Sequence, residues 1–300
     1  MSAVEPRPEP GAEPPPDGPH LLYDQVAEAS AALVIERYSS SFGLASRLLA
    51  EPVRTQVRNV YALVRVADEV VDAPRPDSTR AQQAHVLDEL EAEVRVALVR
   101  GHSSNLVVHA FARTARRCGI GHDLIDPFFA SMRTDLFRAE HDQASFDRYV
   151  YGSAEVIGLM CLRAFLAEEP EPDTAYDALA GGAQRLGAAF QKVNFLRDLA
   201  TDDGLLGRSY FPGVDPARLD DATRDRLLDD IDADLAAAAA VIPDLPPSSR
   251  RAVSVAHGLF AELAARLRRT PASEIRARRV RVPGPVKARI AARCLLRGPR

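Results

Sequence analysis

The sequence predicts an all-α fold, and three observations support this prediction. Apolar residues recur at spacings of three and four from about Leu21 onward, which is the period of an amphipathic helix. Alanine and leucine are abundant, and alternating runs of β-branched residues are scarce. Glycine and proline punctuate the chain at intervals that suit helices. Together these features predict one helical domain that spans residues 21–300.

Candidate helix boundaries follow from turn-forming residues and short polar side chains. Ser145 and Asp173 each precede an apolar helical stretch, where a side-chain oxygen can cap free backbone N–H groups. Roughly eight to ten helices remain between the expected breaks. These breaks lie at 51–52, 73–76, 101–104, 119–121, 169–172, 204–207, 212–216 and 243–247.

Residues 1–20 differ from the rest of the chain and predict a disordered, proline-rich tail. They include seven prolines together with several acidic and glycine residues. This composition buries too little apolar surface to offset the entropy of ordering. The segment also lacks the apolar core of a signal peptide. No run of about 18 uninterrupted apolar residues occurs in the chain, so the sequence predicts no membrane-spanning helix.

The charge distribution is uneven, although the net charge is only −4. Residues 266–300 carry a net charge of +11, and the remainder carries −15. Such a basic end suits anionic lipid, an acidic substrate or nucleic acid, and it equally suits a solvated end of an amphipathic helix. The three cysteines are far apart and show no metal-binding spacing, which fits a reducing cytosol.

The first candidate site is a polar stripe on a helix between Tyr61 and Asp72. Tyr61, Arg65, Asp68 and Asp72 follow at spacings of four, three and four, which places all of them on one helix face. Valines on the other sides indicate a largely buried helix. Two buried carboxylates would repel each other, and Mg²⁺ would neutralise both. An exposed helix face with an ordinary Arg–Asp pair explains the same pattern.

The second candidate site is a similar stripe inside an apolar helix. Gln191, Asn194, Asp198 and Asp202 follow at spacings of three, four and four. An amide carbonyl and two carboxylates form a ligand set made only of oxygen, which Mg²⁺ prefers. A polar stripe of this length on a buried helix is hard to explain as solvated surface.

A flexible connection at 204–207 follows the second stripe and leads to Arg208 and Tyr210. A mobile segment there would act as a lid, and Arg208 would contact a diphosphate. Metal-assisted departure of diphosphate explains both stripes at once. The leaving group carries about three negative charges, which Mg²⁺ ions and arginines stabilise as the C–O bond breaks.

At these residues the chain resembles the squalene and phytoene synthase family. The resemblance runs through most of the chain, and the combination of motifs is highly specific. The matching segments are 38–42, 45–49, 61–72, 149–160, 191–202, 208–212, and 279–283 followed by Lys287.

The resemblance implies an isoprenoid-synthase bundle of helices around a central apolar cavity. It implies head-to-head condensation of two identical prenyl diphosphates through a cyclopropyl diphosphate intermediate. Mg²⁺ is the implied cofactor, and Mn²⁺ is an alternative. The implied metal ligands, direct or through water, are Asp68, Asp72, Asn194, Asp198 and Asp202.

The resemblance also implies roles for individual side chains, and the apolar cavity would exclude water that quenches a carbocation. The implied catalytic residues are Asp68, Asp72, Asp198, Asp202, Tyr61 and Arg65. The implied substrate-binding residues are Ser39, Ser41, Tyr61, Arg65, Gln191, Arg197, Arg208 and Tyr210. The chain departs from many relatives at Tyr38, Glu155 and Phe260, and Glu155 fits either the cavity or the helix surface.

Within the family, the expected activity is that of a phytoene synthase acting on two geranylgeranyl diphosphates. Squalene synthases take a hydride from NADPH and usually carry a C-terminal membrane helix, and this chain shows neither that helix nor a dinucleotide-binding fingerprint. The alternative is a C30 enzyme that makes squalene, dehydrosqualene or presqualene diphosphate from farnesyl diphosphate. A non-catalytic scaffold of the same fold would be expected to lose the aspartates.

The expected location is the cytoplasm, with peripheral contact at the inner face of the plasma membrane, because a long prenyl chain partitions into membranes. The basic segment 266–300 is the candidate contact. No nucleic-acid partner is expected. The sequence leaves the oligomeric state open.

Overall fold

The computed structural model describes residues 19–39, 41–73, 75–201 and 208–296, and this part of the chain is helical with no strand. One isolated bridge joins Glu140 to Ser209. The predicted all-α fold class is therefore confirmed. The elements in chain order are α1 (Pro19–Tyr38), α2 (Ser41–Ser46), α3 (Val53–Asp72), α4 (Arg80–Arg100), α5 (Leu106–Cys118), α6 (His122–Phe137), α7 (Gln143–Val150), the π-helix η1 (Tyr151–Glu155), α8 (Val156–Leu166), α9 (Pro172–Thr201), the 3₁₀-helix η3 (Pro216–Arg218), α10 (Asp221–Val241), the 3₁₀-helix η4 (Ile242–Asp244), α11 (Pro247–Arg269), α12 (Ala272–Ile275) and α13 (Gly284–Leu296).

Helix ends fall at the predicted breaks within the described residues, but both predicted helix starts are wrong in detail. Asp142 caps α7, because its carboxylate accepts a hydrogen bond of 2.7 Å from the backbone N–H of Ser145. A charged cap three residues earlier therefore replaces the predicted hydroxyl cap. Asp173 lies inside the first turn of α9, where it forms an ion pair of 2.6 Å with Arg163.

The N-terminal boundary differs slightly from the prediction, because α1 already begins at Pro19. Residues 1–18 lie outside the described part, so the disordered tail stays a prediction. The continuous helical stretch Gln143–Leu166 is long and apolar enough, by length and composition, to cross a membrane. However, 67% of its most apolar window is buried inside the fold. Such burial is what the core helix of a bundle shows.

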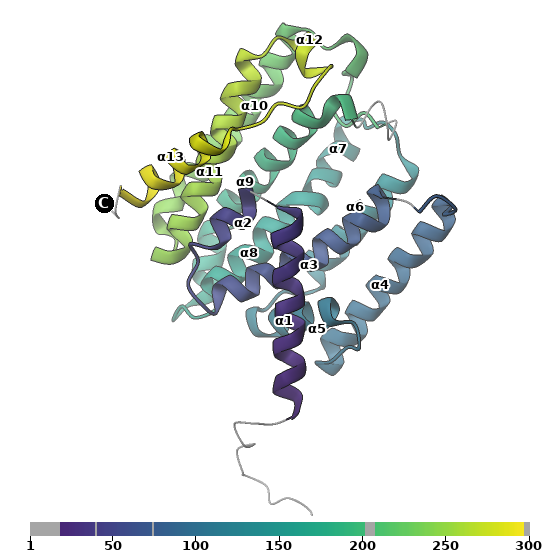
Figure 1. The fold of residues 1–300 in the computed structure, drawn as a ribbon, viewed down its shortest axis with the longest axis vertical. Coiled ribbons are helices and arrows are strands. Elements are labelled where there is room, and N and C mark those ends of the chain that lie inside the picture. The colour runs from purple at the N-terminus through teal and green to yellow at the C-terminus, as the bar shows by residue number, and fades with distance from the viewer. Residues whose placement is uncertain (1–18, 40, 74, 202–207, 297–300) are drawn as a thin grey trace, which may run out of the picture.

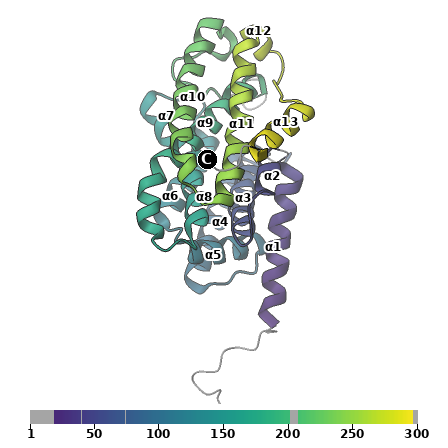
Figure 2. The ribbon, with the colours of Figure 1, turned by 90° about the vertical axis from the view of Figure 1, so that its left-hand side faces the viewer.

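The helices form a bundle in which α9 is the central element (Figure 1). Helices α8, α10 and α11 pack around α9, and α1 packs against α3 and α5. One large core joins α3, α4, α5, α6 and α8, and a second core joins α9, α10 and α11. Helix α13 returns along α11, close to α2 (Figure 2). The two predicted stripes, on the C-terminal parts of α3 and α9, therefore belong to the same helical bundle.

Close contact between α9 and the stretch formed by η1 and α8 depends on glycine. A Cβ added at Gly187 would lie 2.5 Å from the backbone oxygen of Ala154, and one at Gly158 would lie 2.6 Å from that of Ala183. The π-helix η1 lies at this contact. π-Helices are rare in proteins, and those that occur are often found at functional sites. Glycine at these positions thus lets the backbones of α8 and α9 come into contact.

Replacing Gly187 by alanine should destabilise the protein by about 1–3 kcal/mol, because the added methyl group meets backbone that cannot move aside cheaply. Gly181→Ala is the matched control on the same helix, since a Cβ there has nothing within 4 Å. It should gain up to about 1 kcal/mol from better helix propensity. Urea denaturation of both variants measures the difference. Equal stability of the two variants would contradict the close packing.

Candidate functional site

A cavity of about 840 Å³ lies among α3, α8, α9, α10 and α11. Its polar end carries the predicted stripes. Helix α9 lines the cavity from Leu179 to Asp198, and these two residues, 19 positions apart, are separated by about 28 Å along the helix axis. Apolar side chains line the opposite end, among them Leu162, Phe165, Leu179, Leu245 and Val253. The cavity therefore offers one surface for charge and another for hydrocarbon.

The first stripe faces this cavity from α3. Tyr61, Arg65, Asp68 and Asp72 all line it, as their spacing predicted. Arg65 forms an ion pair with Glu69 and lies 3.9 Å from an oxygen of Asp68. Glu69 itself does not line the cavity, so it holds Arg65 from the side. The stripe therefore lines a cavity rather than the outer surface of the bundle, although that cavity is open to solvent and the Asp72 side chain is 41% exposed.

Tyr61 and Ser39 connect the first stripe to the end of α1. Both side chains line the cavity, and they hydrogen-bond to each other. Burial raises the pKa of the Tyr61 hydroxyl, while the charge of Arg65 lowers it in part. The phenol is therefore a neutral hydrogen-bonding group at neutral pH.

Asp68 is the carboxylate with the least favourable environment in the first stripe. Its side chain is 30% exposed, and that exposed part faces the cavity. Burial, with repulsion from Asp72 and Asp135, raises the pKa of Asp68 to about 8, although Arg65 opposes the shift. A positive charge placed in the cavity would therefore be stabilised by this group.

The second stripe faces the same cavity from α9. Gln191, Asn194, Arg197 and Asp198 line it. Arg197 Nε donates a hydrogen bond of 2.9 Å to Asp198 Oδ1. Arg279, from the segment after α12, forms an ion pair of 2.7 Å with the same oxygen. Two arginines therefore bind one carboxylate of this stripe, and sequence analysis did not assign Arg279 to the site.

The amides of the second stripe differ in their partners. Gln191 Nε2 donates a hydrogen bond of 3.4 Å to Ser153 Oγ in η1. Asn194 Oδ1 is buried and has no hydrogen-bond partner. A buried carbonyl oxygen without a donor is costly, so this oxygen is a vacant acceptor within the wall of the cavity.

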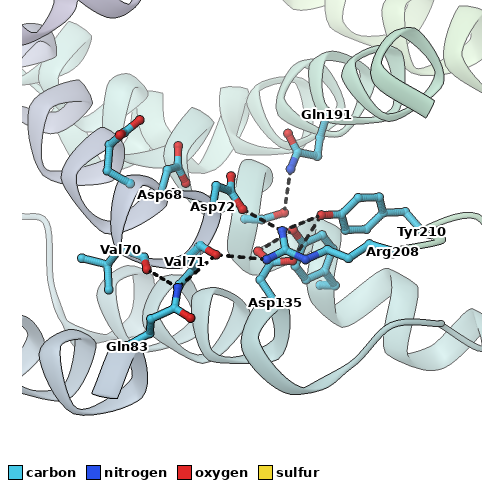
Figure 3. A network of polar contacts seen from close by, with 12 residues as sticks. Asp68, Val70, Val71, Asp72, Gln83, Asp135, Gln191, Arg208 and Tyr210 are labelled. Atoms are coloured by element: carbon cyan, nitrogen blue, oxygen red, sulfur yellow. Dashed lines mark hydrogen bonds and ion pairs between the residues drawn. The ribbon is translucent and has the colours of Figure 1, made fainter. Parts of the chain in front are cut away.

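Arg208 joins the first stripe on α3 to Asp135 on α6 (Figure 3). Its Nη1 atom donates a hydrogen bond of 2.6 Å to Asp72 Oδ1, and its Nη2 atom donates one of 3.2 Å to the Val71 carbonyl oxygen. The same Nη1 atom lies 3.2 Å from the Tyr210 hydroxyl oxygen. Arg208 and Tyr210 both line the cavity. The guanidinium therefore binds the C-terminal end of α3 and also forms part of the cavity wall.

Asp135 on α6 completes this network, and sequence analysis missed it. It accepts a hydrogen bond of 2.8 Å from the Tyr149 hydroxyl and one of 3.3 Å from the Tyr210 hydroxyl. Burial and repulsion from Asp72 raise its pKa to about 7, against the charge of Arg208. The signal that could have revealed it is an acidic residue between Met132 and Leu136 on the apolar face of a helix.

Comparison with known proteins decides the family. The sequence model of the family described as "Squalene/phytoene synthase" matches residues 35–285. The chain belongs to the squalene/phytoene synthase family. This is a family of enzymes, whose reaction is the head-to-head condensation of two prenyl diphosphates.

Relatives within the squalene/phytoene synthase family carry several names. The "15-cis-phytoene synthase" of Paracoccus sp. (strain N81106 / MBIC 01143) is 29% identical over 256 residues, which cover 78% of this chain and 80% of the relative. The "4,4'-diapophytoene synthase" of Staphylococcus haemolyticus is 28% identical over 186 residues, which cover 59% of each chain. A solved dehydrosqualene synthase in complex with a ligand superposes with a TM-score of 0.77 at 20% identity, over 93% of this chain and 98% of that one. The last similarity confirms the isoprenoid-synthase fold of the family.

Two residues implied by the squalene/phytoene synthase pattern cannot be placed. The side chain of Ser41 and all of Asp202 lie outside the described residues, as does the predicted lid at 204–207. Their roles stay predictions. Among the residues that are described, no cluster of three or more His, Cys, Asp or Glu side chains has the geometry to hold a metal ion.

The donor set nevertheless suits magnesium. Asn194, Asp68, Asp72 and Asp198 all line the cavity, and their side chains carry the oxygen ligands that Mg²⁺ prefers. Burial and repulsion from Asp72 raise the pKa of Asp68, so a cation beside it would favour its charged form. The chemistry of these residues therefore suits a hard divalent cation, and the predicted ligand set stays a prediction.

The structure shows the surroundings of the three residues that differ from those of many family members. The guanidinium of Arg65 lies 4.6 Å from the centre of the Tyr38 ring, so Tyr38 holds this arginine by a cation–π contact. Phe260 lines the cavity and stacks on Phe190 at 3.8 Å between ring centres. Glu155 does not line the cavity, which agrees with the surface interpretation.

The basic residues of the C-terminal segment lie in two different environments. Arg279, Arg281 and Lys287 line the cavity, which fits an acidic substrate. Arg289 and Arg293 on α13 are exposed to solvent. Part of the positive charge therefore belongs to the site, and part remains on the surface.

In protein kept free of divalent cations, Asp68→Asn should raise the free energy of unfolding, and the gain should grow from about pH 4 to pH 8. The folded protein keeps this carboxyl protonated up to about pH 8, whereas the unfolded chain ionises it near pH 4. The folded state thus holds the extra proton, and wild-type stability falls as pH rises through this window. We expect a gain of about 1–2 kcal/mol at pH 8, because water in the cavity screens the charge.

Chemical denaturation at several pH values from 5 to 8, with a chelator present, checks this prediction. Asp232→Asn is the control, since this exposed aspartate on α10 pairs with Arg268 outside the cavity. Its effect should not change over the same range. A difference between wild type and Asp68→Asn that is independent of pH would contradict the assignment.

Proposed function

We propose that the protein condenses two molecules of geranylgeranyl diphosphate head to head to form phytoene, a step of carotenoid biosynthesis. The observation that carries the proposal is a long apolar cavity that ends between two helices bearing carboxylates and arginines. The apolar end suits two hydrocarbon chains. The polar end suits their diphosphates. The Paracoccus relative, named a phytoene synthase, supports the choice of product.

The arginines would act on the departing diphosphate. As the C–O bond breaks, its electron pair moves to the diphosphate oxygen, and an allylic cation remains. Arg65, Arg197 and Arg208 present guanidinium groups to this end of the cavity. Guanidinium groups form strong paired hydrogen bonds with phosphate oxygens, so they stabilise the charge that develops. Gln191, Ser39 and the hydroxyls of Tyr61 and Tyr210 would orient the same group.

Mg²⁺ is the proposed cofactor, with Mn²⁺ as an alternative. Asp68, Asp72, Asn194 and Asp198 would hold it, with Asp202 as a further ligand. When bound, the metal would add positive charge next to the leaving diphosphate. The vacant oxygen of Asn194 and the raised pKa of Asp68 support this assignment.

The fate of the cation depends on the cavity walls. The double bond of the second substrate attacks the cation, and loss of one proton closes a cyclopropane ring. A second diphosphate then leaves, the carbon skeleton rearranges, and loss of a second proton gives phytoene. No reductant enters this sequence, so NADPH is not required. Apolar walls exclude water, and the rings of Tyr149, Phe195 and Tyr210 face the cation from one side.

A C30 enzyme acting on farnesyl diphosphate is the second candidate. The Staphylococcus relative is named a diapophytoene synthase, at an identity close to that of the Paracoccus relative. The difference between the two candidates lies in the length of the hydrocarbon chain. A non-catalytic scaffold is less well supported, because Asp68, Asp72 and Asp198 all line the cavity.

The location of the protein follows from its substrate. We propose that it works in the cytoplasm and contacts the inner face of the plasma membrane peripherally. Arg289 and Arg293, exposed on α13, would meet anionic lipid headgroups.

Purified protein with Mg²⁺ should consume geranylgeranyl diphosphate and release phytoene, and a chelator should stop the reaction. Product analysis by chromatography after separate incubation with geranylgeranyl and farnesyl diphosphate checks this. Asp68→Asn and Asp198→Asn should each lower turnover by at least about 100-fold, because each removes a carboxylate proposed to hold the Mg²⁺ that would neutralise the leaving diphosphate. Asp232→Asn should retain turnover. If the wild type consumes neither diphosphate, the enzyme proposal fails.

Phe165→Ala should raise the ratio of C20 to C15 turnover, because it enlarges the apolar end of the cavity. Competition between the two diphosphates in one reaction measures this ratio. Phe137→Ala is the matched control, since Phe137 on α6 is 64% exposed and does not line the cavity. An unchanged ratio for Phe165→Ala would show that this end does not set the chain length.

A further inference from the structure

Asp135 occupies a position that disfavours a carboxylate in two ways. It lies in the last turn of α6, where the helix dipole repels negative charge. Its side chain is also only 6% exposed. A carboxylate in such a place costs free energy unless donors surround it. The groups that offset this cost therefore indicate what Asp135 does.

All of these groups belong to the wall of the cavity. The Tyr149 hydroxyl donates to one carboxylate oxygen at 2.8 Å, and the Tyr210 hydroxyl donates to the other at 3.3 Å. The guanidinium of Arg208 lies 3.7 Å away. Tyr149, Tyr210 and Arg208 line the cavity, and so does Asp135.

Arg208 lies between two carboxylates. Its Nη1 atom is 2.6 Å from Asp72 Oδ1 and 3.7 Å from Asp135 Oδ1, and its Nη2 atom donates to the Val71 carbonyl oxygen (Figure 3). If Asp72 coordinates a metal, its hold on Arg208 weakens. Asp135 does not belong to either aspartate motif, so it keeps Arg208 in place independently of the metal ligands.

We propose that Asp135 is a positioning residue, which holds Arg208 and Tyr210 at the polar end of the cavity so that they meet the diphosphate. The proposal rests on the proposed function, because Arg208 needs a diphosphate partner there. In this proposal Asp135 acts on Arg208 and Tyr210 rather than on the diphosphate itself. Its effect on the reaction should therefore pass through Arg208.

A double-mutant cycle tests this dependence. Asp135→Asn alone should lower kcat by about 10- to 100-fold, with a smaller change in KM. In the Arg208→Ala background the same substitution should change kcat by less than about 3-fold, because the residue that Asp135 positions is gone. Equal effects in the two backgrounds, or no effect in either, would overturn the proposal.

Binding of inorganic pyrophosphate with Mg²⁺, measured by calorimetry, repeats the cycle without turnover. Asp135→Asn should weaken this binding about 10-fold in the wild-type background and little in Arg208→Ala. If wild type binds pyrophosphate with this dependence but consumes no prenyl diphosphate, the proposed function fails and the role of Asp135 stands. If turnover is present without the dependence, only the role of Asp135 fails.

Asp234→Asn controls for loss of stability. Asp234 is also a buried, ion-paired aspartate on a helix, but it pairs with Lys192 and Arg185 and lies outside the cavity. It should lower the melting temperature with little change in the pyrophosphate affinity of the folded protein. If Asp135→Asn does not fold, Tyr149→Phe takes its place, because it removes one hydrogen bond from Asp135. Its effect should likewise shrink in Arg208→Ala, and additive effects would overturn the proposal.

Discussion

Charge balance at the polar end of an apolar cavity is the constraint on which the site depends. A carboxylate that is removed from water without a partner costs several kcal/mol. Here each described carboxylate of the motifs, Asp68, Asp72 and Asp198, lies near an arginine, and two of these arginines come from distant segments: Arg208 holds Asp72, and Arg279 holds Asp198. The first ion pair ties the end of α3 to the segment that carries Arg208, and the second ties the end of α9 to the segment after α12. The helical framework and the chemistry of the site therefore share the same contacts.

Much of the fold and of the site follows from periodicity alone. A helix repeats its face every three to four residues, so the spacing of Tyr61, Arg65, Asp68 and Asp72 was sufficient to place them together. The same rule placed Gln191 and its neighbours on α9. Both stripes line the cavity. Local sequence, however, could not show that they face each other, because that depends on how α3 and α9 pack.

The residues that sequence analysis missed enter the site from other helices or loops. Asp135 comes from α6 and Arg279 from the segment after α12, and neither belongs to a spaced motif. Long-range packing places them, and no spacing in the chain encodes it. The start of α7 was missed for a local reason, since Asp142 competes with Ser145 as a cap and wins by carrying a charge. The length of the substrate escaped prediction because side chains from several helices close the far end.

The length of helix α9 fixes the distance between the apolar and the polar end of the cavity. It carries apolar wall residues near Leu179 and the metal-ligand candidates near Asp198 on one rigid rod. One residue inserted between them would rotate everything downstream by about 100° and direct the polar stripe at the neighbouring helices. Insertions can accumulate in the connections between helices, but this interval has to keep its length. A change of substrate length in this chain would then have to come from the size of the side chains that line the cavity rather than from a longer or shorter α9.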